Sequence, residues 1–172
     1  MRTLLLIATL FISVNSMAQS FEKSIGNTKD EIIYKGTVTF ADLEKETTFK
    51  WFTEGAATYK PDAESITYLK KELKNYNMVV LMGTWCEDSH NMIPKLFRVL
   101  RDTDYKFTKF TMYGLDRNKQ GRNNEETKYH VTSVPTVILF SGEDEIGRIT
   151  ELVEKSVEAD LPDKISFGPI DL

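Results

Sequence analysis

An uninterrupted apolar run at residues 78–82, Met-Val-Val-Leu-Met, constrains the fold of this chain more than any other segment. A strand with one face in water alternates polar and apolar residues, so this run predicts a strand buried on both faces of a sheet. A helix is predicted next, at residues 87–101, because apolar residues recur there at the spacing of one helix face: Ile93, Leu96, Phe97 and Leu100. A buried strand followed by an amphipathic helix indicates an α/β fold.

The rest of the chain continues this alternation. Helical spacing and capping residues predict helices at 43–59, at 62–76 capped by Asp62, at 122–129, and after a cap at Ser156. Strands are predicted at 36–40, 107–113, 134–140 and 145–150, of which the last two form a hairpin. Residues 19–35 are polar, have few core candidates and are interpreted as a leader.

The first 18 residues have the pattern of a secretory signal peptide. Arg2 gives a positive start, residues 4–12 are almost entirely apolar, and the small residues Ser16 and Ala18 suit a cleavage site. The apolar run is shorter than the ~20 residues that a membrane span requires. We therefore expect an exported protein, periplasmic or secreted, with no stable membrane insertion after cleavage.

Charge and cysteine content narrow the function classes. The net charge of −4 gives no electrostatic basis for binding nucleic acid or an anionic membrane surface. The single cysteine, Cys86, excludes a disulfide within the chain.

Cys86 stands at the predicted start of the helix at 87–101, directly after the buried strand. The N–H groups and the positive dipole end of a helix favour a thiolate over a thiol. Glu87 and Asp88 place two carboxylates beside the sulfur, and like charge opposes ionisation. The position predicts a reactive thiol whose activation is partly offset.

These residues resemble a known family. Trp85-Cys86-x-x-Ser89 after a buried strand, Pro94 eight residues after the cysteine, and Val134-Pro135-Thr before an apolar strand together resemble the thioredoxin superfamily over residues 61–165. The stretches at 83–89 and 145–149 are similar to a bacterial subgroup with a single-cysteine Cys-x-Asp-Ser motif. The resemblance implies a thioredoxin-like fold with a central mixed β-sheet flanked by helices. Residues 61–172 would form that domain, and residues 19–60 an N-terminal extension packing on its core.

The resemblance also implies site roles. Cys86 matches the attacking cysteine and Trp85 the tryptophan that flanks it. Pro135 matches a proline whose preceding peptide bond is cis and which packs against the sulfur. Val134 matches the residue whose backbone pairs with an extended substrate.

Three positions depart from the family pattern. Ser89 stands where the resolving cysteine would be, and a hydroxyl cannot release a mixed disulfide by thiol–disulfide exchange. Val80 replaces a buried aspartate that assists proton transfer, and Met112 stands near the place of its lysine partner. An isolated molecule therefore lacks the two-cysteine cycle.

The sequence allows two alternative roles for several side chains. Ser89 is either a thiolate hydrogen-bond donor or a first-turn residue that satisfies a backbone group. His90, four residues after Cys86, fits a general base or metal pair, although the family pattern favours an exposed, variable residue there. His130 is interpreted as a polar edge residue. An aromatic cluster is interpreted as core of the N-terminal segment rather than a ligand box: Phe49, Trp51, Phe52 and Tyr59.

Two functions compete. The leading prediction is a monothiol thiol–disulfide oxidoreductase in which Cys86, assisted by Ser89, forms a mixed disulfide that another thiol resolves. Its partner would be a disulfide- or thiol-containing protein or a small thiol. The alternative is a redox-inactive binding module that holds a peptide or protein beside Trp85 and Pro135. We expect no cofactor and no metal. A shared iron–sulfur cluster, as in monothiol glutaredoxins, is disfavoured because Gly83 and Thr84 supply no lysine before the cysteine.

Overall fold

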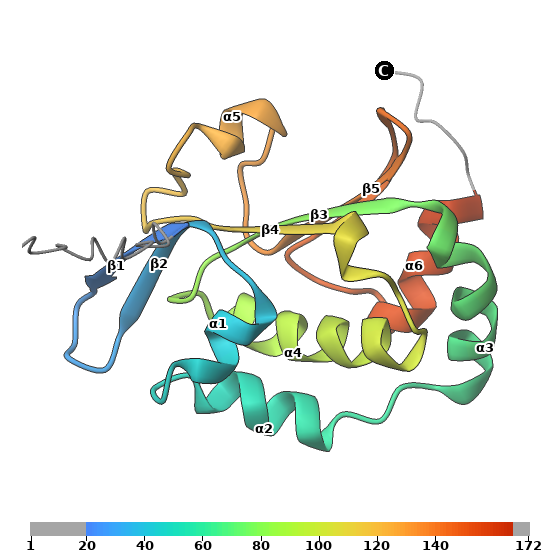
Figure 1. Ribbon diagram of the computed structural model, residues 1–172, viewed down its shortest axis with the longest axis horizontal. Coiled ribbons are helices and arrows are strands. Elements are labelled where there is room, and N and C mark those ends of the chain that lie inside the picture. Colours follow the sequence, from blue (N-terminus) through green and yellow to red (C-terminus); the bar gives the residue numbers. More distant parts are fainter. Residues whose placement is uncertain (1–19, 167–172) are drawn as a thin grey trace, which may run out of the picture.

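The structure, a computed structural model, describes residues 20–166 (Figure 1). The predicted signal peptide lies outside the described residues. The described part contains these elements in chain order: β1 Phe21–Ile25, β2 Ile32–Thr37, α1 Phe40–Lys45, α2 Lys50–Thr58, α3 Ala63–Glu72, the 3₁₀ turn Leu73–Asn75, β3 Asn77–Met82, α4 Glu87–Asp102, the 3₁₀ turn Phe107–Lys109, β4 Phe110–Gly114, α5 Glu125–Lys128, β5 Thr136–Ser141, β6 Asp144–Thr150 and α6 Val157–Ser166.

The strands form one mixed sheet in the order β1-β2-β4-β3-β5-β6. β3 runs parallel to β4 and antiparallel to β5, and the other neighbours are antiparallel. Helices α2, α4 and α6 lie on one face of the sheet, and α5 lies on the other (Figure 1). The predicted architecture, an α/β fold with a central mixed sheet flanked by helices, is confirmed.

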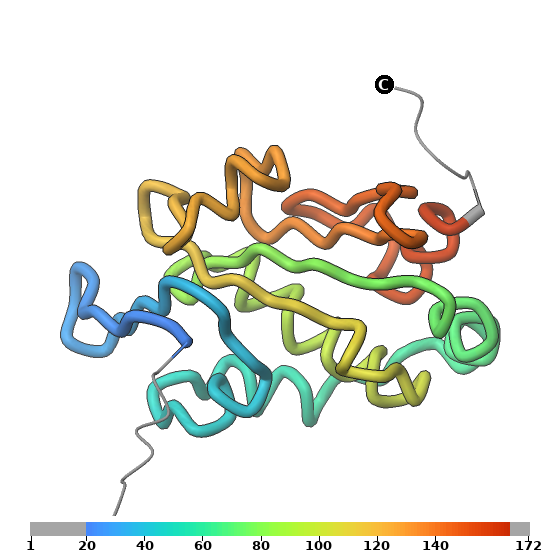
Figure 2. Tube along the Cα trace, turned by 45° about the horizontal axis from the view of Figure 1, so that its top comes forward, coloured from blue at the N-terminus to red at the C-terminus, as the bar shows by residue number. Residues whose placement is uncertain are grey.

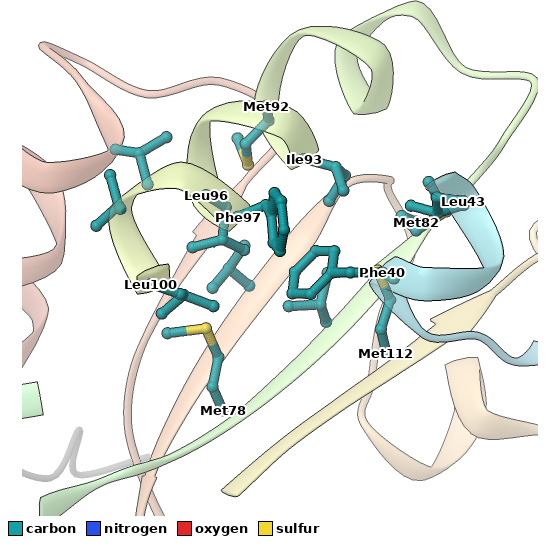
Figure 3. Close-up of a cluster of buried hydrophobic side chains, with 14 of the residues drawn as sticks. Phe40, Leu43, Met78, Met82, Met92, Ile93, Leu96, Phe97, Leu100 and Met112 are labelled. Carbon is teal, nitrogen blue, oxygen red and sulfur yellow. The ribbon is translucent and has the colours of Figure 1, made fainter. Parts of the chain in front are cut away.

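The main core fills the space between the sheet and α4 (Figure 3). Every residue of β3 after its first is buried, as the apolar run predicts. The predicted stripe of α4 is also buried, and it meets side chains from the strands and α1: Met78, Met82, Met112, Phe40 and Leu43. Burying each such side chain contributes about 1.5–3 kcal/mol, so this layer holds α4, and with it Cys86, against the sheet.

Gly55 lies where α2 packs on α4. A Cβ atom at Gly55 would lie 2.9 Å from the Cβ of Pro94. Glycine costs about 1 kcal/mol relative to alanine in a helix interior, so the residue that weakens the local helix permits close contact between two helices.

The N-terminal prediction needs correction. The supposed leader at 19–35 contains β1 and most of β2, and Ile32, Ile33 and Tyr34 are buried. The strand expected at 36–40 ends at Thr37. A capping box between Thr39 and Asp42 then begins α1, so the single helix expected at 43–59 is two helices. The physical reason is pairing across the sheet, which local periodicity does not contain.

The C-terminal elements follow the prediction with shifted ends. The strand expected at 107–113 begins at Phe110, because a 3₁₀ turn occupies 107–109. The strand expected at 134–140 begins at Thr136, and α5 is confined to 125–128. Both predicted caps are confirmed: Asp62 accepts from Ser65 N–H at 2.8 Å, and Ser156 accepts from Ala159 N–H at 3.3 Å.

Residues 20–60 contact the rest of the described chain through α2 against α4 and β2 against β4. Tyr59 Oη also donates to the buried Glu158 at 2.7 Å. The boundary at residue 60 remains a prediction. Within residues 20–166 there is no helix long and apolar enough to cross a membrane.

Candidate functional site

Cys86 is the N-cap residue of α4, with φ −96° and ψ 125°. Its backbone N–H donates to Gly83 O at 3.0 Å, and its carbonyl accepts from His90 N–H at 3.0 Å. The residue as a whole is partly exposed. As predicted, the sulfur therefore lies at the N-terminus of a long helix, at the end of a buried strand.

Val134 faces the sulfur from the loop before β5. Cys86 Sγ–H donates to Val134 O at 3.2 Å, and the Val134–Pro135 peptide bond is cis. The structure thus brings together the three residues that the resemblance associates with the reacting sulfur and the substrate backbone. Since the contact requires the thiol proton, it is lost when Cys86 ionises or reacts.

Trp85 is held from two sides. Its Nε1–H donates to Leu115 O at 2.9 Å, and the Arg117 guanidinium lies 5.4 Å from the ring centroid. A Cβ atom at Gly83 would lie 2.8 Å from the indole ring, so glycine lets the ring fold back over its own turn. Arg117 in turn pairs with Glu31 of the β1–β2 turn.

Ser89 is fully buried, and its Oγ accepts a hydrogen bond from Gly83 N–H at 3.1 Å. This contact matches the first-turn role, in which the hydroxyl satisfies a backbone group. Because the hydroxyl still carries a proton, the donor role toward a thiolate remains a prediction.

Thr84 attaches the turn to the N-terminal hairpin. Its side chain is buried, accepts from Tyr34 N–H at 3.1 Å and donates to Ile32 O at 2.8 Å. In Figure 2 the β1–β2 hairpin, in blue, lies at the same end of the molecule as the turn between β3 and α4. Sequence reasoning missed Thr84, because its partners are 50 and 52 residues away and no local pattern marks them.

His90 is partly buried, unlike the exposed residue that the family pattern favours. Its Nε2 lies 2.8 Å from Thr84 O, and its ring stacks on Trp51 with a centroid distance of 4.3 Å and an interplanar angle of 18°. A carbonyl oxygen only accepts, so Nε2 carries the proton in this contact. No group of three His, Cys, Asp or Glu side chains within residues 20–166 could hold a metal ion.

The remaining candidates divide between core and surface. Phe49 and Phe52 are buried, as the core interpretation predicts, whereas Trp51 is only partly buried. His130, whose φ is +52°, accepts from Arg148 through its carbonyl.

Val80 and Met112, the two departures in the sheet, are buried Cα partners in the β3–β4 register. These two positions therefore place only apolar side chains in the sheet behind the site.

No protein-family model matches the sequence, and no curated protein matches it significantly. Among solved structures, the chain is similar to oxidised thioredoxin O2 from Arabidopsis thaliana at 21% identity, over 61% of this chain and 86% of that chain, with a TM-score of 0.38. It is similar to oxidised mitochondrial thioredoxin 3 from Saccharomyces cerevisiae at 17% identity, over 58% and 87%, with a TM-score of 0.37. A protein of unknown function from Pseudomonas aeruginosa shares 14% identity over 67% and 70%, with a TM-score of 0.43.

Proposed function

We propose that this chain is an exported, periplasmic or secreted, monothiol thiol–disulfide oxidoreductase of the thioredoxin superfamily, in the single-cysteine Cys-x-Asp-Ser subgroup. One observation carries the proposal: the partly exposed residue Cys86 places the chain's single thiol at the N-terminus of α4, 3.2 Å from the carbonyl that precedes Pro135. A structural cysteine, in contrast, is usually fully buried and inert.

The Cys86 thiolate attacks one sulfur of a substrate disulfide. The Cys86–substrate bond forms, the substrate S–S bond breaks, and the released thiolate takes up a proton. An external thiolate then attacks the Cys86 sulfur, which releases reduced substrate and leaves Cys86 disulfide-bonded to the external thiol. A second external thiolate attacks the external sulfur of that disulfide and releases Cys86 as a thiolate. One substrate disulfide is thereby reduced, and two external thiols are oxidised to one disulfide.

Val134 supports substrate binding in this scheme. Its carbonyl accepts from the Cys86 thiol in the resting state. When Cys86 ionises, the carbonyl loses that donor and can accept from a backbone N–H of an extended peptide, as in strand addition. Reaction at the sulfur and pairing with the peptide are thus linked through one oxygen.

The second candidate is a redox-inactive binding module that uses the groove beside Trp85 and Pro135. The commitment of buried Ser89 to Gly83 N–H favours it, because that position then supports the turn rather than a redox cycle. Partner binding that survives Cys86→Ala, in a protein whose native Cys86 forms no adduct with a peptide disulfide, would identify this second function.

Incubation of the full chain with a peptide disulfide, followed by intact-mass measurement, tests the leading proposal. A matched control carries Cys86→Ala with Ser141→Cys, which moves the single thiol to an exposed strand end. We expect the native chain to form the mixed disulfide at least about tenfold faster than the control, in keeping with thiolate stabilisation at a helix N-terminus. Equal rates would refute an activated thiol. Sequencing the N-terminus of the protein from its host tests export, which predicts a start at Gln19.

A further inference from the structure

A pocket of about 260 Å³ lies beside the thiol-bearing turn. The β1–β2 turn, the segment at the start of α2, the turn residues Thr84 and Trp85, and His90 of α4 form its walls. Trp85 precedes Cys86, and the N–H of His90 bonds to the Cys86 carbonyl. The pocket therefore begins within one helical turn of the reacting residue.

Aromatic rings form one part of the lining. Trp51 and His90 stack on each other, and Trp85 is a third aromatic residue in the lining. The faces of indole rings attract ammonium and guanidinium groups. Arg117 already shows this contact in the structure, because its guanidinium lies over the Trp85 ring.

The charged side chains of the pocket are acidic. Asp30 and Glu31 line it, and its lining within residues 20–166 contains no lysine or arginine. Burial acts to raise the pKa of Glu31, but hydrogen bonds from Asn27 N–H and Arg117 hold it below the ordinary value, so Glu31 is ionised. Arg117 compensates Glu31, which leaves the exposed Asp30 as the main attraction for a cation.

The surface beside the pocket is also negatively charged. Glu87 and Asp88 are exposed in the first turn of α4. Glu87 lies three residues before His90, and residues so spaced share a helix face. The approach to the thiol therefore carries further carboxylates, which favour positively charged groups.

We propose that this pocket is a subsite for a lysine or arginine side chain of the protein or peptide with which Cys86 reacts. The inference rests on the proposed function, since it names the substrate class for that site. The carboxylate of Asp30 attracts the cation, and the aromatic side chains that line the pocket contact its alkyl stem.

Intrinsic fluorescence can test binding directly, because Trp51 and Trp85 are the only two tryptophans of the chain. The probes are blocked five-residue peptides with a central serine in place of cysteine and one arginine at each flanking position in turn. Matched peptides carry citrulline, which keeps the shape of arginine without its charge. The protein is the full chain with Cys86→Ser, so that binding is measured without covalent reaction.

For at least one position of the arginine, we expect the arginine peptide to bind about threefold to tenfold more tightly than the citrulline peptide of the same design. Asp30→Asn should at least halve that ratio, whereas Asp144→Asn, an exposed carboxylate on β6, should leave it unchanged. Equal binding of the two peptide series at every position of the arginine would overturn the inference, as would a ratio that Asp30→Asn does not reduce.

Adduct formation by the native chain with the cysteine versions of these peptides, activated as disulfides, separates the two proposals. If the arginine preference holds but no adduct forms, the subsite stands and the redox function fails. If adducts form at equal rates from arginine and citrulline peptides and binding is also equal, the redox function stands and the subsite fails.

Discussion

The sulfur of Cys86 lies 3.2 Å from the carbonyl oxygen of Val134, a residue 48 positions later in the chain. This contact joins the N-terminus of α4, which follows β3, to the loop before β5, and β3 and β5 are neighbouring strands of the sheet. It places the only thiol of the chain beside a backbone acceptor that a substrate peptide can use.

Thr84→Val should destabilise the protein by about 2 kcal/mol, because Tyr34 N–H and Ile32 O would both lose a buried partner. Thr84→Ser keeps the hydroxyl and should lose less than half as much stability. Urea unfolding of the two variants measures the difference. A larger loss for Thr84→Ser than for Thr84→Val would mean that the methyl group, and not the hydroxyl, attaches the turn to β2.

Gly55→Ala should lower the free energy of unfolding by about 1 kcal/mol or more, although alanine is the better helix former. The added Cβ would lie 2.9 Å from the Pro94 Cβ and force α2 away from α4. Glu54→Ala, at an exposed position of the same helix, is the control and should change stability little. Thermal unfolding that shows Gly55→Ala to be stabilising would contradict this packing.

Glu46 should contribute pH-dependent stability. The hydrogen bond from Lys23, at 2.5 Å, holds the pKa of Glu46 below its ordinary value of 4.5; burial opposes this effect, and Tyr34 Oη adds a second donor at 3.0 Å. The folded pKa is the lower one, so the stabilisation is present above the unfolded pKa and is lost as pH falls through the folded pKa.

Glu46→Gln should therefore cost about 1 kcal/mol at pH 7 and progressively less below pH ~4.5. Denaturant titrations of both proteins between pH 7 and pH ~3 measure the difference. A gap that stays constant over this range would show that the carboxylate charge contributes nothing.

Ser89→Cys should allow an internal disulfide with Cys86 and raise disulfide-reductase activity with a dithiol reductant. The variant should also lose about 1 kcal/mol of stability, because sulfur is a weaker acceptor for Gly83 N–H than the native hydroxyl. Ser89→Ala, which removes both acceptor and thiol, is the control for the stability effect. A reduced Ser89→Cys protein that shows native activity would mean that the missing second thiol does not limit turnover.

The elements that carry the thiol could be predicted from the sequence. The 78–82 run and the stripe of α4 each encode their burial in local periodicity, and both are buried as expected. The position of Cys86 at the helix start follows from these two elements alone.

The surroundings of the thiol could not be predicted in the same way. β1 buries only Phe21 and leaves Ile25 exposed. The sequence of β1 therefore has no alternating apolar pattern that would predict its pairing with β2. The bonds of Thr84 and the stack of His90 on Trp51 depend on segments brought together by that pairing and by α2. Local patterns contain neither, because both are products of tertiary contact.

Mixed disulfides of Cys86 can be trapped in the native host, which is the decisive test of the proposed redox function. Cells are quenched in acid, free thiols are blocked with N-ethylmaleimide, and the Cys86 peptide is analysed by mass spectrometry without reduction. We expect a fraction of Cys86 to be disulfide-bonded to another protein or a small thiol, and this fraction to rise under oxidising conditions. A Cys86 peptide that carries only the blocking group under every condition would refute the redox function.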